Sequence, residues 1–176
     1  MVTITRRTSL AALAAFGLGP SAPLDARAEA PKGYVLAADQ GEHLIRNGGS
    51  IRIKADPTRG CRSLAMGTQQ VPVGAGIPIH RHFHMDEAFY VIEGNGSFVF
   101  EDEKLSAAKG GTIFIPKNTW HGFMNPDTEL LLLWIVAPAG LEAFFREVAS
   151  PPGEPQRALT KIQLNEIARR HGMEFK

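Results

Sequence analysis

Cysteine is almost missing from this chain of 176 residues, in which Cys61 is the only one. A single cysteine excludes an internal disulfide, a zinc ribbon and a CxxC redox pair. We expect Cys61 to be a small buried hydrophobic residue, and a reactive thiol is the weaker alternative. Any metal or catalytic chemistry must therefore come from other residue types.

An excess of charge of one sign is missing too. The chain has 19 basic and 18 acidic residues, a formal charge of +1. Without residues 1–28, which hold three arginines and one aspartate, 16 basic and 17 acidic residues remain, a formal charge of −1. This balance gives no electrostatic basis for binding nucleic acid or an anionic membrane surface. We expect neither as a partner.

Long hydrophobic runs and several catalytic signatures are also lacking. The Ala/Leu-rich stretch from Leu10 to Leu18 is too short to cross a bilayer, so no membrane span is expected. The chain has no Ser-His-Asp pattern, phosphate-cradling loop or dinucleotide fingerprint, and Gly94-Asn95-Gly96 indicates a tight turn instead. We find no internal repeat, low-complexity block or second domain.

Residues 1–28 indicate export. The paired Arg6 and Arg7 precede the apolar stretch, and Ala26–Ala28 offers a small-x-small cleavage site. This pattern is similar to a twin-arginine signal peptide, although Ser9 stands where such signals usually carry Phe. An ordinary secretory signal and an uncleaved tail are the alternatives. We expect an exported, periplasmic bacterial protein.

Residues 33–140 consist of short apolar runs separated by Gly, Pro and Asn. Residues 51–54 alternate apolar and basic side chains, as a half-buried strand does. Further strands are expected at 87–92, 97–101, 113–115 and 130–136. We expect the strands at 87–92 and 97–101 to form a hairpin around Gly94. Many short strands with turns between them predict an all-β sandwich or barrel.

Residues 141–176 have helical patterns instead. Four apolar residues recur with helical spacing: Leu141, Phe144, Phe145 and Val148. Thr160 and Gln163 form a capping box that begins a second helix, and Gly172 is expected to end it. We expect both helices to pack on the outside of the barrel, and a role in clasping a dimer is the alternative.

Three histidines and one glutamate are the candidate metal ligands. His80 and His82 lie on one face of a strand, about 7 Å apart along it. Glu87 begins the next strand, and the turn at residues 116–119 directs His121 back toward them. Three imidazoles and a carboxylate suit a divalent ion, and octahedral geometry would leave two positions for water, dioxygen or substrate.

Some neighbouring residues allow more than one interpretation. His84 follows the same alternation and could line the pocket, but a solvated loop histidine is favoured. We expect His43 and His171 at the surface, and Glu93 as a charge at a strand end. Six aromatic residues could line a substrate pocket, with core packing favoured for most: Phe89, Phe98, Phe114, Trp120, Phe123 and Trp134. Four basic residues could pair with a substrate carboxylate, with solvation favoured: Arg52, Lys54, Arg59 and Arg62.

Two segments of the chain resemble the two signature motifs of the cupin superfamily. Residues 74–94 read G-x5-H-x-H-x4-E-x6-G, and residues 110–125 read G-x5-P-x4-H-x3-N. The second departs once, because Asn118 stands where glycine is usual, and asparagine tolerates left-handed backbone. The first motif and its neighbours are similar to small single-domain cupins described as quercetin-dioxygenase-like.

The resemblance implies a cupin-type jelly-roll barrel over residues 33–140, and the helical patterns described above predict two C-terminal helices over 141–176 after it. It implies a homodimer and one divalent ion, Fe, Mn, Ni, Cu or Zn, whose ligands are His80, His82, Glu87 and His121. We expect a metal-dependent dioxygenase acting on a small organic substrate, with Glu87 as both ligand and proton acceptor. The alternatives are a metal-dependent isomerase or lyase and a non-catalytic periplasmic binding protein.

Overall fold

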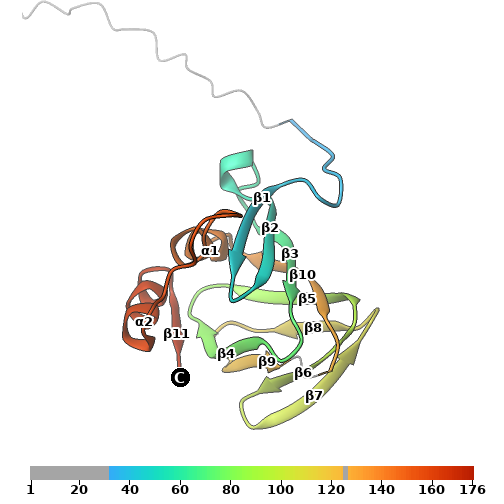
Figure 1. The fold of residues 1–176 in the computed structure, drawn as a ribbon, viewed down its shortest axis with the longest axis vertical. Coiled ribbons are helices and arrows are strands. Elements are labelled where there is room, and N and C mark those ends of the chain that lie inside the picture. Colours follow the sequence, from blue (N-terminus) through green and yellow to red (C-terminus); the bar gives the residue numbers. More distant parts are fainter. Residues whose placement is uncertain (1–31, 125–126) are drawn as a thin grey trace, which may run out of the picture.

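A computed structural model describes residues 32–124 and 127–176 of the protein (Figure 1). Asn125 and the expected export signal lie outside these residues. In the part of the chain described, the strands form two antiparallel sheets. One sheet has the order β1 (Glu42–Arg46), β2 (Gly49–Ala55), β3 (Ala65–Val71), β10 (Leu130–Ala137), β5 (Asp86–Glu93) and β8 (Thr112–Ile115). The other has the order β11 (Met173–Phe175), β4 (Gly76–His82), β9 (His121–Met124), β6 (Asn95–Phe100) and β7 (Glu103–Ala108).

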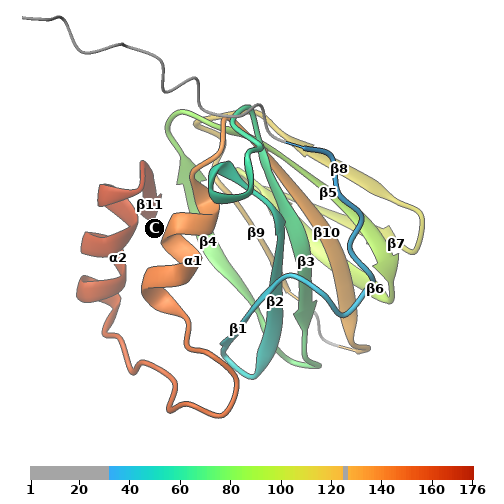
Figure 2. The same cartoon turned by 90° about the horizontal axis from the view of Figure 1, so that it is seen from above.

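The inward faces of both sheets form one apolar core. In β2, Ile51 and Ile53 are buried and the residue between them is not, as the alternation predicts. Every second residue of β10 is buried in the same way, and Trp134 at its centre is fully buried. The two facing sheets, seen edge-on in Figure 2, confirm the expected all-β jelly-roll fold.

The expected hairpin around Gly94 is wrong. Strand β5 pairs with β10 and β8, whereas β6 pairs with β7 and β9 in the other sheet. The turn therefore carries the chain from one sheet to the other. Gly94 has φ of 83°, and a Cβ there would lie 2.1 Å from the Glu129 carbonyl oxygen beside β10. The sequence shows where the chain turns, but not which sheet the next strand joins.

Gly94→Ala is expected to lower the free energy of unfolding by more than about 2 kcal/mol. The left-handed backbone alone costs alanine about 1–2 kcal/mol, and the contact with Glu129 adds to it. Gly110→Ala is the matched control, because Gly110 has φ of 85° but a Cβ added there would meet no other atom within 4 Å. Chemical denaturation measures both variants. Equal losses of unfolding free energy in Gly94→Ala and Gly110→Ala would show that the contact with Glu129 contributes nothing.

The C-terminal region contains helices α1 (Leu141–Val148) and α2 (Lys161–Arg170), which lie side by side in Figure 2. Helix α1 buries the apolar face that its spacing predicts. Helix α2 begins with both hydrogen bonds of the expected capping box, between Thr160 and Gln163. Among the described residues, neither helix is long and apolar enough to cross a membrane.

Strand β11 follows α2 and is not expected from the sequence. After the turn at Gly172, it pairs antiparallel with β4, so that Met173 lies opposite His82 and Phe175 lies opposite His80. Three residues are too few for a period-two pattern to be visible, which is why the sequence does not predict this strand. The C-terminal segment thereby joins the edge of this sheet, beside strand β4, which carries two of the candidate ligands (Figure 1).

Candidate metal centre

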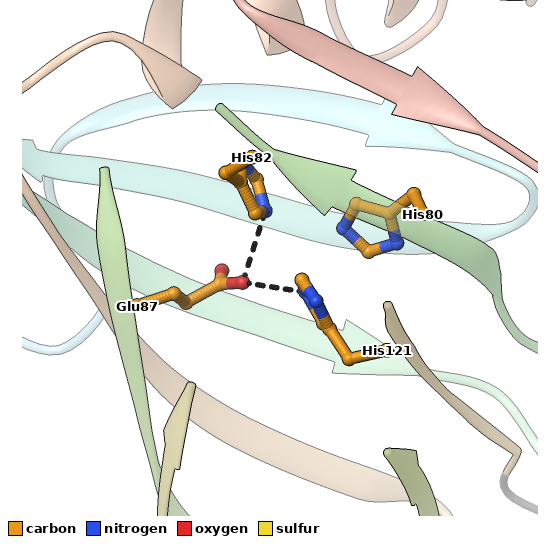
Figure 3. Close-up of side chains that lie close together, drawn as sticks. All are labelled: His80, His82, Glu87 and His121. Carbon is orange, nitrogen blue, oxygen red and sulfur yellow. Dashed lines mark hydrogen bonds and ion pairs between the residues drawn. The ribbon is translucent and has the colours of Figure 1, made fainter. Parts of the chain in front are cut away.

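His80, His82, Glu87 and His121 come together inside the barrel (Figure 3). One ligand atom from each lies within 4.8 Å of the others, and all four residues are at most 5% exposed. His80 and His82 alternate along β4, and His121 begins β9, which pairs His121 directly with His80. Glu87 reaches across from β5 in the opposite sheet. The structure thus brings together every residue of the expected ligand set.

Backbone carbonyls fix the orientation of two of the imidazole rings. Nδ1 of His80 donates to the Pro78 carbonyl and Nδ1 of His121 donates to the Thr119 carbonyl, each at 2.9 Å. A neutral imidazole that donates through Nδ1 has a lone pair on Nε2. Both rings therefore direct an electron pair into the cluster. This arrangement holds histidine ligands in many metal sites.

One contact of Glu87 places acceptor against acceptor as long as His121 is neutral. Its Oε2 lies 3.1 Å from Nε2 of His121 and 3.1 Å from Nε2 of His82 (Figure 3). The contact with His121 is a hydrogen bond only if that ring carries a second proton. Neither ring nitrogen of the buried His82 has a hydrogen-bond partner among the described residues. Buried polar atoms without partners are costly, so a cation among these atoms, a proton or a metal ion, would stabilise the cluster.

Burial and neighbouring side chains shift the pKa values of two groups in the cluster. Burial, together with His121 and His82, lowers the pKa of His80 well below its usual value, so this ring is neutral near pH 7. Burial raises the pKa of Glu87, but His82 and His121 outweigh it and hold that pKa well below its usual range. A carboxylate and imidazole nitrogens form a donor set that first-row divalent ions accept.

The turn before His121 has the backbone geometry that its sequence requires. Asn118 adopts φ of 65°, the left-handed conformation expected for it in place of glycine. Its backbone N–H donates to the His82 carbonyl at 2.6 Å, which fastens the turn to β4. Gly74 before this strand has a positive φ, but Gly76 does not. A Cβ on Gly76 would lie 2.3 Å from the Phe123 carbonyl oxygen, so close approach of β9 explains that glycine.

Other candidate residues lie away from the cluster. His84 is exposed in the bend after β4, as its solvated interpretation predicts, and Glu93 is exposed at the end of β5. His43 and His171 are partly buried rather than fully at the surface, and each bonds to a nearby side chain, Ser50 and Glu147 respectively. Cys61 is half-buried, not buried as expected, because it lies in the loop between β2 and β3.

The cluster borders a small cavity of about 80 Å³. His80 and Glu87 lie in its wall, together with mainly apolar side chains from both sheets. Of the six aromatic candidates, Phe89 and Phe123 line it, while Phe98 and Trp134 are core residues and Phe114 is 64% exposed. Trp120 packs under the Arg81 guanidinium at 4.5 Å.

Sequence reasoning missed the cavity residues Gln69, Phe144 and Phe175 because nothing in the local pattern places them near the histidines.

The basic residues considered for substrate binding do not line this cavity. Arg52 and Lys54 face a separate hollow of about 990 Å³ on the outer surface of the first sheet. There they donate to backbone carbonyls of the segment before β1, Arg52 to Asp39 at 2.5 Å and Lys54 to Ala38 at 2.7 Å. Arg59 and Arg62 are exposed. None of these four side chains can hold a substrate at the cluster.

Comparison with known proteins agrees with the geometry. The model of the family described as "Cupin domain" matches residues 67–137. The chain is 32% identical over 85 residues to an uncharacterized protein of Methanocaldococcus jannaschii, covering 47% of this chain and 67% of that protein. It is 27% identical over 145 residues to quercetin 2,3-dioxygenase of Bacillus subtilis, covering 77% of this chain but only 43% of that enzyme.

A solved structure adds support for the fold. An uncharacterized conserved protein of Klebsiella pneumoniae with a double-stranded β-helix domain superposes with a TM-score of 0.51 at 17% identity. The match covers 61% of this chain and 91% of that one. Two sheets in jelly-roll order, a matching family model and both sequence motifs lead to the same assignment: this chain belongs to the cupin superfamily.

Proposed function

We propose that this cupin holds one divalent metal ion through His80, His82, Glu87 and His121. The observation that carries this proposal is the pair of 3.1 Å contacts between Glu87 Oε2 and imidazole nitrogens, one of them on a ring whose other nitrogen already donates its proton. A divalent ion among these atoms satisfies the carboxylate and the imidazole lone pairs together. The identity of the ion, Fe, Mn, Ni, Cu or Zn, is open to measurement.

We further propose that the protein is a metal-dependent dioxygenase acting on a small organic substrate. Four protein ligands leave open positions on an octahedral ion, and a mainly apolar cavity borders the cluster. The partial similarity to a quercetin 2,3-dioxygenase supports oxygen chemistry. When bound, the ion would supply a Lewis-acidic centre for dioxygen or a substrate oxygen.

The residues of the chain have separable roles in this proposal. The carbonyls of Pro78 and Thr119 hold His80 and His121 in the orientation that a ligand needs. Glu87 uses Oε2 toward the histidines, which leaves Oε1 as the atom that could take a proton from the substrate. Because its pKa is held well below the usual range, Glu87 is a stronger ligand than base, and Oε1 would hold a proton only transiently.

Dioxygen uptake tests the oxygenase proposal. We expect protein purified with stoichiometric Fe, Mn, Ni or Cu to consume dioxygen with one member of a panel of flavonols, catechols and β-diketones. Metal content is measured by mass spectrometry and uptake with an oxygen electrode. Glu87→Ala is the control and is expected to show no uptake. A stoichiometric metal without uptake on any substrate would contradict the dioxygenase and leave the metal site in place.

A metal-dependent isomerase or lyase is the second candidate. The observation that favours it is the size of the cavity, which at about 80 Å³ is small for a flavonol. Conversion of a small substrate under exclusion of dioxygen would identify this chemistry. Tight binding of a small molecule without conversion would instead identify a binding protein.

A further inference from the structure

The C-terminal segment forms one side of the metal cavity. Seven of its residues line that cavity: Leu141, Phe144, Phe145 and Val148 of α1, Leu164 of α2, and Met173 and Phe175 of β11. The rest of the lining comes from the two sheets and the turn between β1 and β2. Residues 141–175 therefore complete one side of the cavity lining. In Figures 1 and 2 this segment lies along one side of the barrel, with β11 next to β4.

Phe175 is the part of this wall that touches a candidate ligand. Its ring stacks on His80 with centroids 5.3 Å apart and planes 28° from parallel. Its other aromatic neighbour is Phe144, at 6.1 Å. Because Phe175 lies opposite His80 in the register of β11 and β4, the backbone pairing itself sets this contact. Phe175 is only 8% exposed.

Side chains on both sides of β11 hold it in place. The Asn165 side chain makes two hydrogen bonds of 3.0 Å to the backbone of Phe175, one to its carbonyl and one from its N–H. The Glu174 carboxylate accepts from Arg81 at 2.8 Å, and the Lys176 N–H donates to the Ile79 carbonyl at 2.9 Å. These bonds give the aromatic wall a defined position and a defined distance from the cluster.

The space that remains is small. Pockets for drug-sized ligands measure roughly 300–1,000 Å³. A cavity of about 80 Å³ is well below this range, so it suits a compact molecule beside the cluster. Its lining is mostly aliphatic and aromatic, which suits a compact, largely apolar body.

We propose that Phe175, supported by Phe144, is a specificity-determining residue that limits the site to compact, mainly apolar substrates. This proposal rests on the metal site proposed above and assigns its substrate class. Molecules with two linked rings, such as flavonols, are excluded because the second ring would occupy the position of Phe175. Shortening Phe175 should therefore admit them without changing the ligands of the ion.

Two azole probes of different length test this limit on the Co(II)-loaded protein. Imidazole and 4-phenylimidazole share the same donor ring and differ by one phenyl group, and their binding is followed by the visible absorption of Co(II). We expect the wild type to bind 4-phenylimidazole at least about tenfold more weakly than imidazole. Phe175→Ala should gain about tenfold or more for 4-phenylimidazole, because burying the phenyl group becomes favourable.

Further variants keep the test decisive. Phe114→Ala removes an exposed ring outside the cavity and should bind both probes as the wild type does. Phe144→Ala enlarges the same cavity and replaces Phe175→Ala if the latter does not fold. Equal binding of both probes by the wild type, or no gain in the folded cavity variant, would overturn the size limit. Failure of the wild type to take up Co(II) would instead refute the metal site itself, and the size limit with it.

Discussion

Replacing Glu87 or His121 with alanine is expected to abolish tight metal binding while the barrel still folds. Each contributes one of four ligand atoms that lie within 4.8 Å of one another. Loss of an outer-shell partner typically weakens metal binding by about 10–100-fold, so loss of a ligand should cost at least about 100-fold. Mass spectrometry of the dialysed protein gives the metal content, and circular dichroism gives the fold.

The barrel should survive these substitutions because the cluster does not stabilise it without a metal. Each substitution shortens one side chain and leaves the two sheets and the apolar core between them in place. His84→Ala is the matched control, since His84 lies between the ligands in sequence but is exposed and outside the cluster. It should keep its full metal content. Full metal retention in both Glu87→Ala and His121→Ala would refute the assignment of the site.

Arg146→Met is expected to lower the free energy of unfolding by about 3 kcal/mol. Arg146 on α1 makes ion pairs of 2.6 Å with Glu42 of β1 and with Asp56, which is fully buried at the end of β2. Removing one partner of a buried pair costs about 3–5 kcal/mol because the other charge stays buried. The lower end of that range applies because the Arg146 side chain is 30% exposed. Urea denaturation measures the change.

The free energy of unfolding that Arg146→Met loses should decrease as the pH falls. Burial raises the pKa of Asp56, but its hydrogen bonds to Arg146 and Thr58 outweigh it and lower that pKa below its usual value. A lowered pKa stabilises the fold above the unfolded value of about 3.9, and this stability is lost as the pH falls through the folded pKa. The difference between wild type and Arg146→Met should thus shrink below about pH 4.

A surface arginine provides the comparison. Arg169 pairs with Glu174 at 2.7 Å but is 64% exposed, so Arg169→Met should cost no more than about 1 kcal/mol. An Arg146→Met loss as small as that of Arg169→Met would show that solvent screens the buried carboxylate. If the difference in free energy of unfolding between the wild type and Arg146→Met is the same at about pH 7 and about pH 3, the charge of Asp56 is not its cause.

Much of the fold follows from local patterns in the sequence. Alternation in β2 and β10, the capping box of α2 and the apolar face of α1 are each properties of neighbouring residues. Pairing between distant segments is not such a property. The sequence locates the turn at Gly94 correctly, but it suggests a hairpin there because a turn pattern carries no information about the partner sheet.

The candidate site, too, can be predicted where it depends on local patterns and not where it depends on contacts between distant segments. The spacing of the histidines and Glu87 in two motifs identifies residues that the fold brings together. The cavity beside them depends on contacts across the chain, such as that of Phe175 with His80, which are far apart in the sequence and meet only through the pairing of β11 with β4. Arg52 and Lys54 show the converse, because their chemistry suits a substrate but their side chains face away from the cluster.

The division of the ligands between the sheets has a physiological consequence. His80, His82 and His121 belong to one sheet, whereas Glu87 alone belongs to the other. An ion bound by all four would join the two sheets through a single carboxylate and would stabilise the folded state increasingly as its free concentration rises above the dissociation constant. The heat tolerance of this protein would then follow the supply of metal in its surroundings, so that starvation for the ion would reduce the amount of intact protein as well as its activity.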